Sequence, residues 1–474
     1  MKIDLGSGDW NVIDVAEAIG GSLVIGDEIK FSGICTDSRE AGPDVLFVAL
    51  RGERVDGHSY ISKAVELGSK CILAERQVEG IEPSVSFIIV DDSEKALMKM
   101  AKIYSDRTKS RKTIGITGSV GKTTTKEFIG AVLAQKYKTF KTVGNFNSVI
   151  GMPLTLMQIP DDTQTAVLEM AMSGFKEISP MSCAATPDVA VITNIGSSHM
   201  EMLGSRENIC RAKLEILDGL KDDGVAIFNG DEPLLREKNY SFKKIFWIST
   251  KDRNADYFAY NIKYIDKSTV FDVSLRGKIY TNVKIFTLGE HNVYAALFAC
   301  AVGDTLGLSE NEIKLGLEKY QSADMRQQIY DIYNITVIED CYNASPESMT
   351  AALNVLKNIE VKSGGKRIAL LGDMRELGVN SCEYHIAVGK QAAHCSDMLF
   401  TLGNEAKNIA VGARTCGMDE RNIIVNLDCD AYSATVSELV EVLNDGDVLL
   451  VKASRAVRAE RVIEDLKDMI KNRR

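Results

Sequence analysis

The sequence predicts an α/β protein of three domains, and three observations support this fold class. The chain has 474 residues, which is too long for a single hydrophobic core, and this length suggests about three domains. Short apolar runs alternate with helical patterns along almost the whole chain, which is typical of parallel sheets covered by helices. A glycine-containing run at 117–125 follows an apolar strand pattern and precedes a helical pattern.

The first predicted domain covers residues 1–110. Strand-like runs occur at Val45–Leu50 and Phe87–Val90. A polar, basic stretch at 105–112 follows them and is expected to be a linker to the second domain.

The second predicted domain covers residues 111–326 and is expected to hold a central P-loop parallel sheet. A more irregular section at about 243–288 is expected to add flanking antiparallel strands, and a helix is expected from about Asn292. The parallel strands are predicted at Ile114–Thr117, Ala166–Met170, Val189–Thr193 and Val225–Asn229.

The third predicted domain covers residues 327–474 and repeats the alternation of strand and helix. That pattern predicts a small Rossmann-like domain. Its strands are expected at Ile335–Glu339, Arg367–Leu371, Met398–Leu402, Ile423–Val425 and Val448–Val451.

Composition excludes several classes of function. The net charge is -10 with no block of like charges, which argues against nucleic acid or an anionic membrane as the main partner. No segment is an uninterrupted apolar span of membrane length, and the N-terminus lacks a signal-peptide pattern. The ten cysteines are scattered without a C-x-x-C pair, so a reducing cytosol is expected rather than a disulfide framework or zinc site.

The run TGSVGKTTT at 117–125 is predicted to hold the phosphates of a nucleotide. Gly118 and Gly121 let backbone N–H groups approach phosphate oxygens, and the following helix adds a partial positive charge. Lys122 can reach the β- and γ-phosphates, and the Thr123 hydroxyl can bind Mg²⁺. Because the first glycine of the full GxxxxGK[ST] pattern is missing, a chance loop is the alternative.

Two polar side chains follow buried strands of the second domain. Glu169 ends an apolar strand, where an acidic side chain needs a partner, and Mg²⁺ is favoured over a salt bridge or hydrogen bond. His199 lies in the polar loop after the next strand, where a ligand role and a structural role are equally expected. At the carboxyl ends of parallel strands both would lie near the nucleotide.

Lys213 occupies an unusual position on a predicted helix, 206–220. It falls within the apolar face, whereas Arg211, Glu215 and Asp218 point the other way. Either the amine extends to water, or it is desolvated with a lowered pKa and can react with CO₂ to give a carbamate. The residues that define the apolar face are Ile209, Ala212, Ile216, Leu217 and Leu220.

Two further helix starts carry polar residues with two possible roles. His291 and Asn292 open a helix, where they can cap it or, near a nucleotide, Asn292 can contact the base. Asp340 precedes a helix that Ser345 is expected to cap, with Pro346 in its first turn. Asp340 can bond a ribose hydroxyl or act as a cap.

Together these motifs resemble the Mur ligase family of ATP-dependent amide-forming enzymes, over nearly the whole chain. The segments that carry the resemblance, in the family's order, are TGSVGKTTT, LEMAMS, TNIGSSHM, RAKLEI, GEHNVYAA and EDCYNASPESM. Further segments resemble the branch that takes UDP-N-acetylmuramoyl-tripeptide and D-alanyl-D-alanine, namely TDSR, FVALRGERVDGH, GNFNSVIGMPLTL, YNASPESM and LGDMRELG.

The resemblance implies a set of site residues, ATP and, we expect, two Mg²⁺ ions. The implied catalytic residues are Lys122, Lys213 and His199. The implied nucleotide contacts are Gly118, Ser119, Gly121, Lys122, Thr123, Thr124, Asn292, Arg326 and Asp340. The implied metal ligands are Thr123, Glu169, His199 and Lys213 in carbamylated form. The implied substrate contacts are Ser38, Arg39, Asn145, Asn147, Asn343, Ser454 and Arg455.

Some implied roles concern loops rather than single residues. The loop 51–58 of the first domain is expected near the nucleotide sugar. Residues Lys452–Arg455 resemble a KGSR-like motif near the acceptor peptide, although Ala453 replaces the glycine. The resemblance also implies a monomer that binds no nucleic acid and does not insert into membranes.

The implied reaction passes through an acyl phosphate on the tripeptide and needs no side-chain nucleophile. Because its ligands come from three domains, closure of the third domain is expected to precede chemistry. The alternatives are a sibling ligase that adds a single amino acid, in wall or folate metabolism, a P-loop kinase, and a nucleotide-gated binding module. Neither of the last two explains Lys213 together with Glu169 and His199.

Overall fold

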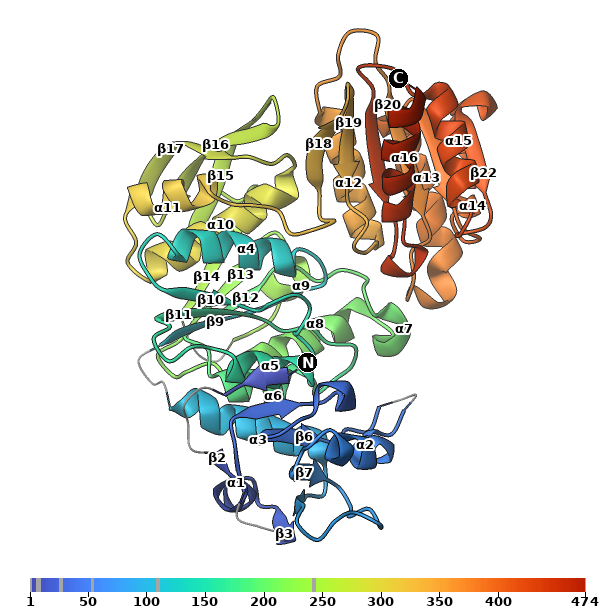
Figure 1. The fold of residues 1–474 in the computed structure, drawn as a ribbon. Helices are drawn as coiled ribbons and strands as arrows, with labels where there is room; N and C mark the ends of the chain where they lie inside the picture. Colours follow the sequence, from blue (N-terminus) through green and yellow to red (C-terminus); the bar gives the residue numbers. More distant parts are fainter. Residues whose placement is uncertain are drawn as a thin grey trace. The chain divides into compact units, whose positions relative to one another are not determined.

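The computed structural model describes residues 2–5, 10–24, 29–52, 55–107, 111–240 and 244–473 (Figure 1). Part of the expected linker, 108–110, and part of the loop 51–58 lie outside these residues. Contacts divide the chain into two compact units, and each is described by itself. One unit contains Met1–Gly115, Lys138–Ala190 and Glu215–Gly224, and the other contains Ile116–Tyr137, Val191–Leu214 and Val225–Arg474.

The N-terminal sheet has six strands in the order β1-β5-β6-β7-β8-β3. Strands β5 to β8 pair in parallel, and β1 and β3 close the two edges in antiparallel. The strands are β1 (Lys2–Asp4), β3 (Ser22–Val24), β5 (Gly33–Cys35), β6 (Val45–Val48), β7 (Cys71–Ala74) and β8 (Ser86–Ile89). The helices are α1 (Val12–Ile19), α2 (Ile61–Glu66) and α3 (Ser93–Asp106).

Continuous burial along the central strands explains why the first domain folds in this way. The four residues of β6 are all buried, and so are the four of β7, as expected of parallel strands covered on both faces. A small ribbon of β2 (Trp10–Asn11) and β4 (Lys30–Phe31) accompanies the sheet. Helix α3 continues to Asp106, so only the first two residues of the expected linker, 105–112, are helical.

The central sheet has nine strands in the order β10-β11-β9-β12-β13-β14-β15-β16-β17. The expectation of antiparallel strands throughout 243–288 was partly wrong, because β14 pairs in parallel with β13 and with β15, and only β15, β16 and β17 are antiparallel. The strands are β9 (Lys112–Thr117), β10 (Thr139–Lys141), β11 (Thr165–Glu169), β12 (Val189–Ile192), β13 (Val225–Asn229), β14 (Lys244–Ser249), β15 (Tyr257–Ile265), β16 (Ser268–Leu275) and β17 (Lys278–Ile285).

The helix predicted at 206–220 is shorter than expected. Helix α8 covers Arg206–Leu214 and a 3₁₀ turn follows at Glu215–Leu217. The hydroxyl of Ser182 donates to the backbone oxygen of Ile216 at 2.6 Å, and backbone N–H groups at 176 and 179 donate to the Glu215 carboxylate. These bonds outside the helix replace its last turn. The other helices here are α4 (Lys122–Leu133), α5 (Gly151–Met157), α6 (Ile178–Ala185), α7 (Met200–Leu203), α9 (Pro233–Arg236), α10 (Glu290–Thr305) and α11 (Glu310–Glu318).

The C-terminal sheet has the strand order β18-β19-β23-β20-β21-β22. Strands β19, β23, β20, β21 and β22 pair in parallel with one another in this order, and β18 pairs in antiparallel with β19 at the edge. The strands are β18 (Gln328–Ile332), β19 (Ile335–Glu339), β20 (Arg367–Gly372), β21 (Met398–Leu402), β22 (Ile423–Asn426) and β23 (Val448–Lys452). The helices are α12 (Pro346–Asn358), α13 (Ser381–Cys395), α14 (Lys407–Thr415), α15 (Tyr432–Val442) and α16 (Glu460–Arg473).

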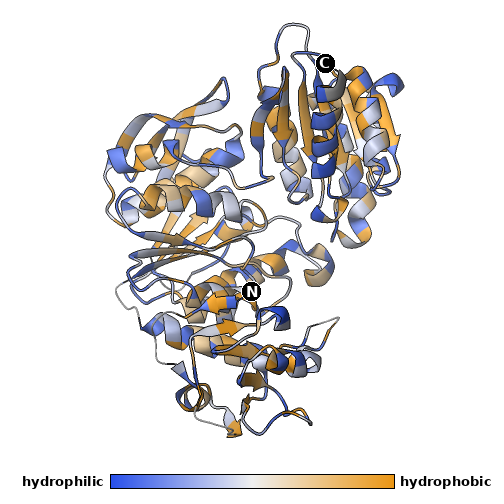
Figure 2. Ribbon diagram, viewed as in Figure 1, coloured by the Kyte–Doolittle hydropathy of each residue, from blue (hydrophilic) through white to orange (hydrophobic). Residues whose placement is uncertain are grey.

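Two apolar cores lie on opposite faces of this C-terminal sheet, whose strands are coloured largely as hydrophobic in Figure 2. Side chains of α12, α13 and α14 form one core, and side chains of α15 and α16 form the other. This is the predicted Rossmann-like architecture, and the α/β fold class is confirmed. Among the described residues, no helix is both long enough and apolar enough to span a bilayer.

Candidate functional site

The phosphate loop connects β9, which ends at Thr117, to α4, which begins at Lys122. Gly121 precedes the helix with a φ of 80°, and no side chain in the described part of the chain caps the helix start by a hydrogen bond. Gly118 has a φ of 153°, and a Cβ atom there would lie 1.8 Å from the Thr193 hydroxyl oxygen. Both glycines therefore suit the backbone of the loop, and the start of α4 has no side-chain cap among the described residues, as expected of a phosphate-binding helix.

The loop is held by Thr193 and Asn194, which follow β12. The Asn194 side-chain oxygen accepts from the N–H groups of Ser119 and Val120 at 3.1 and 3.0 Å. The Thr193 hydroxyl donates to the backbone oxygen of Val120 at 2.7 Å. Sequence reasoning missed this role of Asn194, although the residue lies in the TNIGSSHM segment. A polar residue directly after a buried strand was the available signal.

The remaining polar residues of the phosphate loop and of the first turn of α4 are bonded or buried within the protein. The Ser119 hydroxyl accepts from the N–H group of Gly196 at 2.9 Å, which joins the loop to the segment after β12. Thr123 is buried and Thr124 is half-buried in the first turn of α4. The Lys122 amine donates to the backbone oxygens of Gly118 and Ser119 at 2.7 and 3.3 Å.

Lys213 is buried on α8, with only 1% of its surface exposed. It does not extend to water, so the alternative of an extended amine is wrong. Burial, and secondarily the positive charge of Lys122, hold the pKa of the Lys213 amine well below its usual value. The predicted desolvated amine is therefore present, and the phosphate-loop lysine is close enough to act on it electrostatically.

Glu169 ends β11 and is buried, as expected. Its carboxylate accepts from the side-chain amide of Asn147 at 2.8 Å, and its own N–H donates to the Thr142 hydroxyl. Asn147 thus orients Glu169, while Asn145 is exposed in the same loop. Glu169 belongs to the compact unit that does not contain Lys122.

His199 directly precedes α7 with a φ of 63°, and its Nδ1 atom lies 3.1 Å from a carboxylate oxygen of Glu376. Its neighbour Ser197 donates from its N–H and its hydroxyl to Glu347 at 2.7 and 2.8 Å. A cavity of about 340 Å³ adjoins this segment. It is lined by Asn194, Ile195, Gly196, Ser197, Arg206, Glu232, Glu347 and Tyr384.

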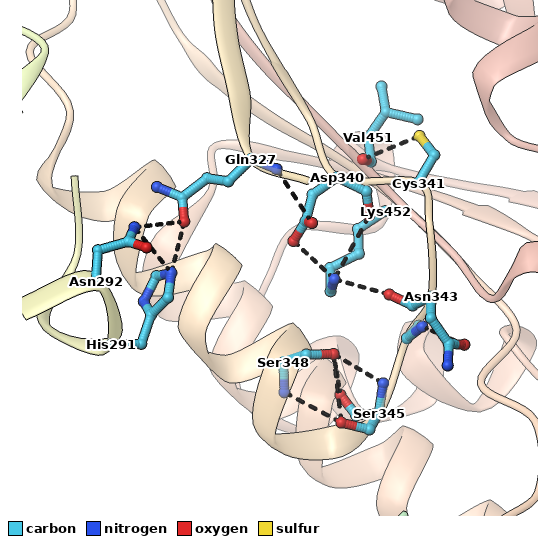
Figure 3. A network of polar contacts seen from close by, with 11 residues as sticks. His291, Asn292, Gln327, Asp340, Cys341, Asn343, Ser345, Ser348, Val451 and Lys452 are labelled. Atoms are coloured by element: carbon cyan, nitrogen blue, oxygen red, sulfur yellow. Dashed lines mark hydrogen bonds and ion pairs between the residues drawn. The ribbon is translucent and has the colours of Figure 1, made fainter. Parts of the chain in front are cut away.

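Asn292 and Asp340 meet through Gln327 (Figure 3). The Gln327 side-chain oxygen accepts from Asn292 at 3.1 Å, and the Gln327 N–H donates to the Asp340 carboxylate at 3.3 Å. Asn292 also donates to the backbone oxygen of Leu288, so it holds the turn before α10. The Arg326 guanidinium lies 4.0 Å from the centre of the Tyr342 ring. The implied adenosine contacts Asn292 and Asp340 are thus connected, and Gln327, which joins them and directly follows Arg326 in the chain, was missed.

Lys452 takes part in this network. Its buried amine donates to the Asp340 carboxylate at 2.7 Å and to the backbone oxygen of Asn343 at 2.9 Å (Figure 3). The Asn343 side chain accepts from the N–H of Ala344 in the segment that leads to α12. Ser345 caps α12, and Pro346 is its first residue, as predicted.

Ala453 stands where the resembled motif has glycine, and it fits there because Gly372 on the neighbouring strand β20 has no side chain. A Cβ atom on Gly372 would lie 2.6 Å from the Cβ of Ala453. Gly372 therefore leaves room for the Ala453 methyl group, and the substitution is accommodated by the facing strand. Ser454 is buried, and Arg455 is exposed.

Replacing Lys452 by Met is expected to destabilise the protein. Methionine keeps the length of the side chain but leaves the Asp340 carboxylate, which is 18% exposed, without its cation. We expect the free energy of unfolding to fall by about 2–3 kcal/mol, measured by urea unfolding. Lys267→Met is the control, because its pair with Asp331 has both side chains about half exposed, and a change below about 0.5 kcal/mol is expected. Equal losses in both variants would contradict the role of the Lys452 pair.

The predicted contacts of the N-terminal domain lie in local networks. Ser38 is buried in a 3₁₀ turn, and the exposed Arg39 pairs with Asp37. His58 of the loop 51–58 is buried, and its Nε2 atom accepts from the N–H of Glu75 at 2.9 Å. His58 is therefore structural, while Arg39 is accessible to a ligand.

The donor groups fit ATP and Mg²⁺. The N-terminus of α4 offers backbone N–H groups to phosphate, and the Thr117 hydroxyl beneath the loop is buried without a hydrogen-bond partner among the described residues. A hydroxyl at Thr123 and a carboxylate at Glu169 are oxygen ligands, which Mg²⁺ prefers, whereas the imidazole of His199 is a less usual ligand for it.

A phosphate loop on a central sheet, a buried lysine on the following helix α8 and a Rossmann-like domain after it are the features of a nucleotide-binding α/β enzyme. Family models agree along the chain. The Mur ligase family catalytic domain matches residues 30–105, the Mur ligase middle domain 116–303, and the Mur ligase glutamate ligase domain 325–455. The chain belongs to the Mur ligase family.

Relatives are similar over almost their full length. UDP-N-acetylmuramoyl-tripeptide--D-alanyl-D-alanine ligase of Bacillus subtilis (strain 168) is 39% identical, covering 96% of this chain and 98% of the relative. The enzyme of that name from Escherichia coli (strain K12) is 31% identical, covering 94% and 95%.

Solved structures of the same kind share the fold. A crystal structure of MurF from Acinetobacter baumannii aligns with a TM-score of 0.87 at 29% identity, covering 97% of this chain and 99% of that chain. MurF ligase from Thermotoga maritima in complex with ADP aligns with a TM-score of 0.83 at 30% identity, covering 93% and 98%.

Proposed function

We propose that this protein is the ATP-dependent ligase that joins D-alanyl-D-alanine to UDP-N-acetylmuramoyl-tripeptide in peptidoglycan synthesis. The observation that carries the proposal is the buried amine of Lys213, whose pKa is lowered by burial and by the positive charge of Lys122 in the phosphate loop. A kinase or a simple nucleotide-binding module has no use for a desolvated amine at this place. Identity of 39% to a ligase of that name over 96% of the chain supports the choice of substrates.

The proposed metal ligands are Thr123, Glu169, His199 and carbamylated Lys213. Bound Mg²⁺ would neutralise negative charge on the phosphate oxygens. Glu169 is kept in one orientation by Asn147, and His199 keeps Nε2 for a ligand while Nδ1 faces Glu376.

The surroundings of Lys213 support its carbamylation. The neutral amine nitrogen attacks the carbon of CO₂, an N–C bond forms, and the nitrogen loses a proton, which leaves a carbamate anion. Lys122 repels a protonated Lys213 but attracts its carbamate, so the reaction changes an unfavourable pair into a favourable one. The same burial that disfavours the ammonium form keeps the amine neutral and reactive.

The proposed reaction has two steps. A carboxylate oxygen of the tripeptide attacks the γ-phosphorus of ATP, an O–P bond forms, and ADP leaves with the electrons of the broken bond. The amine of D-alanyl-D-alanine then attacks the acyl carbon, loses a proton, and the tetrahedral intermediate releases phosphate. Lys122 stabilises negative charge on the phosphoryl oxygens, and Asn194 keeps the loop in the shape that holds them.

Release of ADP from purified protein tests this function. ATP, Mg²⁺, UDP-muramoyl-tripeptide and D-alanyl-D-alanine should together give ADP and an amide product, and omission of either acceptor or tripeptide should prevent amide formation. Stronger stimulation by a single amino acid would indicate a sibling ligase. No ADP and no amide from any combination would exclude the proposal.

A further inference from the structure

The carboxyl ends of β20 and β23 lie side by side, yet their chains continue to opposite faces of the C-terminal sheet. Helix α13 follows β20 on the face of one core, and α16 follows β23 on the face of the other. In open α/β sheets, ligands bind in the crevice outside such a point. The segments that leave it begin with Asp373 and with Ala453.

These two segments are joined by hydrogen bonds. The N–H of Ser454 donates to the backbone oxygen of Asp373 at 3.0 Å, and the N–H of Arg375 donates to the Ser454 hydroxyl at 3.0 Å. The N–H of Met374 donates to Nε2 of the buried His385 at 3.0 Å. Three hydrogen bonds therefore fix the backbone that carries Arg375.

The Arg375 side chain is also held, but it is not covered. Its Nη2 atom lies 3.0 Å from a carboxylate oxygen of Asp373, and the two side chains are 51% and 2% exposed. The other carboxylate oxygen of Asp373 accepts from the N–H of Ala406 at 2.8 Å, so the buried charge is compensated. A guanidinium has five donors in one plane, and those directed away from Asp373 remain for a second carboxylate.

Arg455, on the other segment, is directed elsewhere. Its Nη1 atom lies 2.5 Å from the carboxylate of Glu460 and 3.6 Å from the sulfur of Met325. These contacts direct the Arg455 guanidinium toward α16 and the segment before β18. Of the two arginines, Arg375 is therefore the one whose guanidinium remains at the carboxyl ends of β20 and β23, where a ligand is expected.

We propose that Arg375 binds the terminal carboxylate of the acceptor dipeptide, and that Asp373 is the positioning residue that orients it. This inference deepens the proposed function and rests on it. Glu376, the next residue, pairs with His199. A dipeptide spans roughly 7 Å, so an acceptor held at Arg375 has its amine near the His199 segment, where the acyl phosphate is expected.

Acceptor kinetics test this role with two probes, D-alanyl-D-alanine and D-alanyl-D-alaninamide, which lacks the carboxylate. For the unchanged enzyme we expect KM for the amide to exceed KM for the acid by about tenfold to a hundredfold. Arg375→Ala should raise KM for the acid by that factor and leave KM for the amide and for ATP unchanged. Arg375→Lys should give an intermediate KM, because it keeps the charge but not the planar pair of donors.

Arg421→Ala is the matched control. Arg421 pairs with Asp419 two residues before it, as Arg375 does with Asp373. Its side chain is 88% exposed, and it does not lie in the segments that follow β20 and β23. It should leave the acid-to-amide ratio of KM values unchanged. An unchanged ratio in Arg375→Ala with normal ligation would overturn this inference alone. No ligation by the unchanged enzyme would remove the proposed function and this inference with it.

Discussion

Replacing Lys213 by Ala is expected to reduce the rate of ligation by about 10²–10³-fold, a loss typical for the removal of one group that stabilises developing charge. Short carboxylates such as acetate or formate should restore part of the activity, because they can occupy the space that the carbamate leaves. The comparison is Lys126→Ala. Lys126 is also buried, but its amine pairs with Glu127 at 3.2 Å, so no carboxylate should rescue that variant.

A second measurement separates the carbamate from a purely structural lysine. Protein equilibrated with ¹³C-labelled CO₂ should show a carbamate carbon resonance that is absent in Lys213→Ala and present in Lys126→Ala. Removal of CO₂ should lower activity, and its return should restore it. Full activity of Lys213→Ala, or no labelled carbamate on the unchanged protein, would disprove the modification.

Much of the fold was predictable because buried parallel strands are continuous apolar runs. Ile335–Glu339, Met398–Leu402 and Val225–Asn229 were predicted with the bounds that the structure has. β14 was misassigned because a strand's own pattern does not tell whether its neighbour runs parallel or antiparallel. The end of α8 was misassigned because its last turn is replaced by bonds from Ser182 and the segment around 176–179.

Site residues were predictable where the local sequence pattern determines whether a side chain lies on a buried or an exposed face. Lys213 was placed on an apolar helical face with two alternatives, an amine that extends to water or a desolvated one, and the structure has the buried form. Partners that are distant in sequence were not predictable. Lys452 reaches Asp340 across 112 positions, and the Asn194 side chain reaches Ser119 across 75. No periodicity records such pairs, so their roles appear only when the strand ends are brought together.

Replacing Gly118 by Ala is expected to weaken ATP binding at least about a hundredfold, because the phosphate loop must move. A Cβ atom would lie 1.8 Å from the Thr193 hydroxyl oxygen and 3.0 Å from its Cβ, and the φ of 153° is unfavourable for alanine. Neither atom can give way easily, since Thr193 holds the loop through Val120. A displacement of about 1 Å suffices for a loss of this size. Titration with a fluorescent ATP analogue measures it.

Gly121→Ala separates steric conflict from backbone strain in the same loop. Gly121 has a φ of 80°, but a Cβ atom there would meet no atom within 4 Å. Its cost should therefore be limited to about 1–2 kcal/mol of left-handed strain, or roughly tenfold in affinity. Thr193→Ala alone should weaken binding, since the bond to Val120 is lost. Combined with Gly118→Ala, it should cost less than the sum of the two, because the hydroxyl that obstructs the new methyl is gone. Additive losses would show that the Thr193 hydroxyl is not what excludes a side chain at 118.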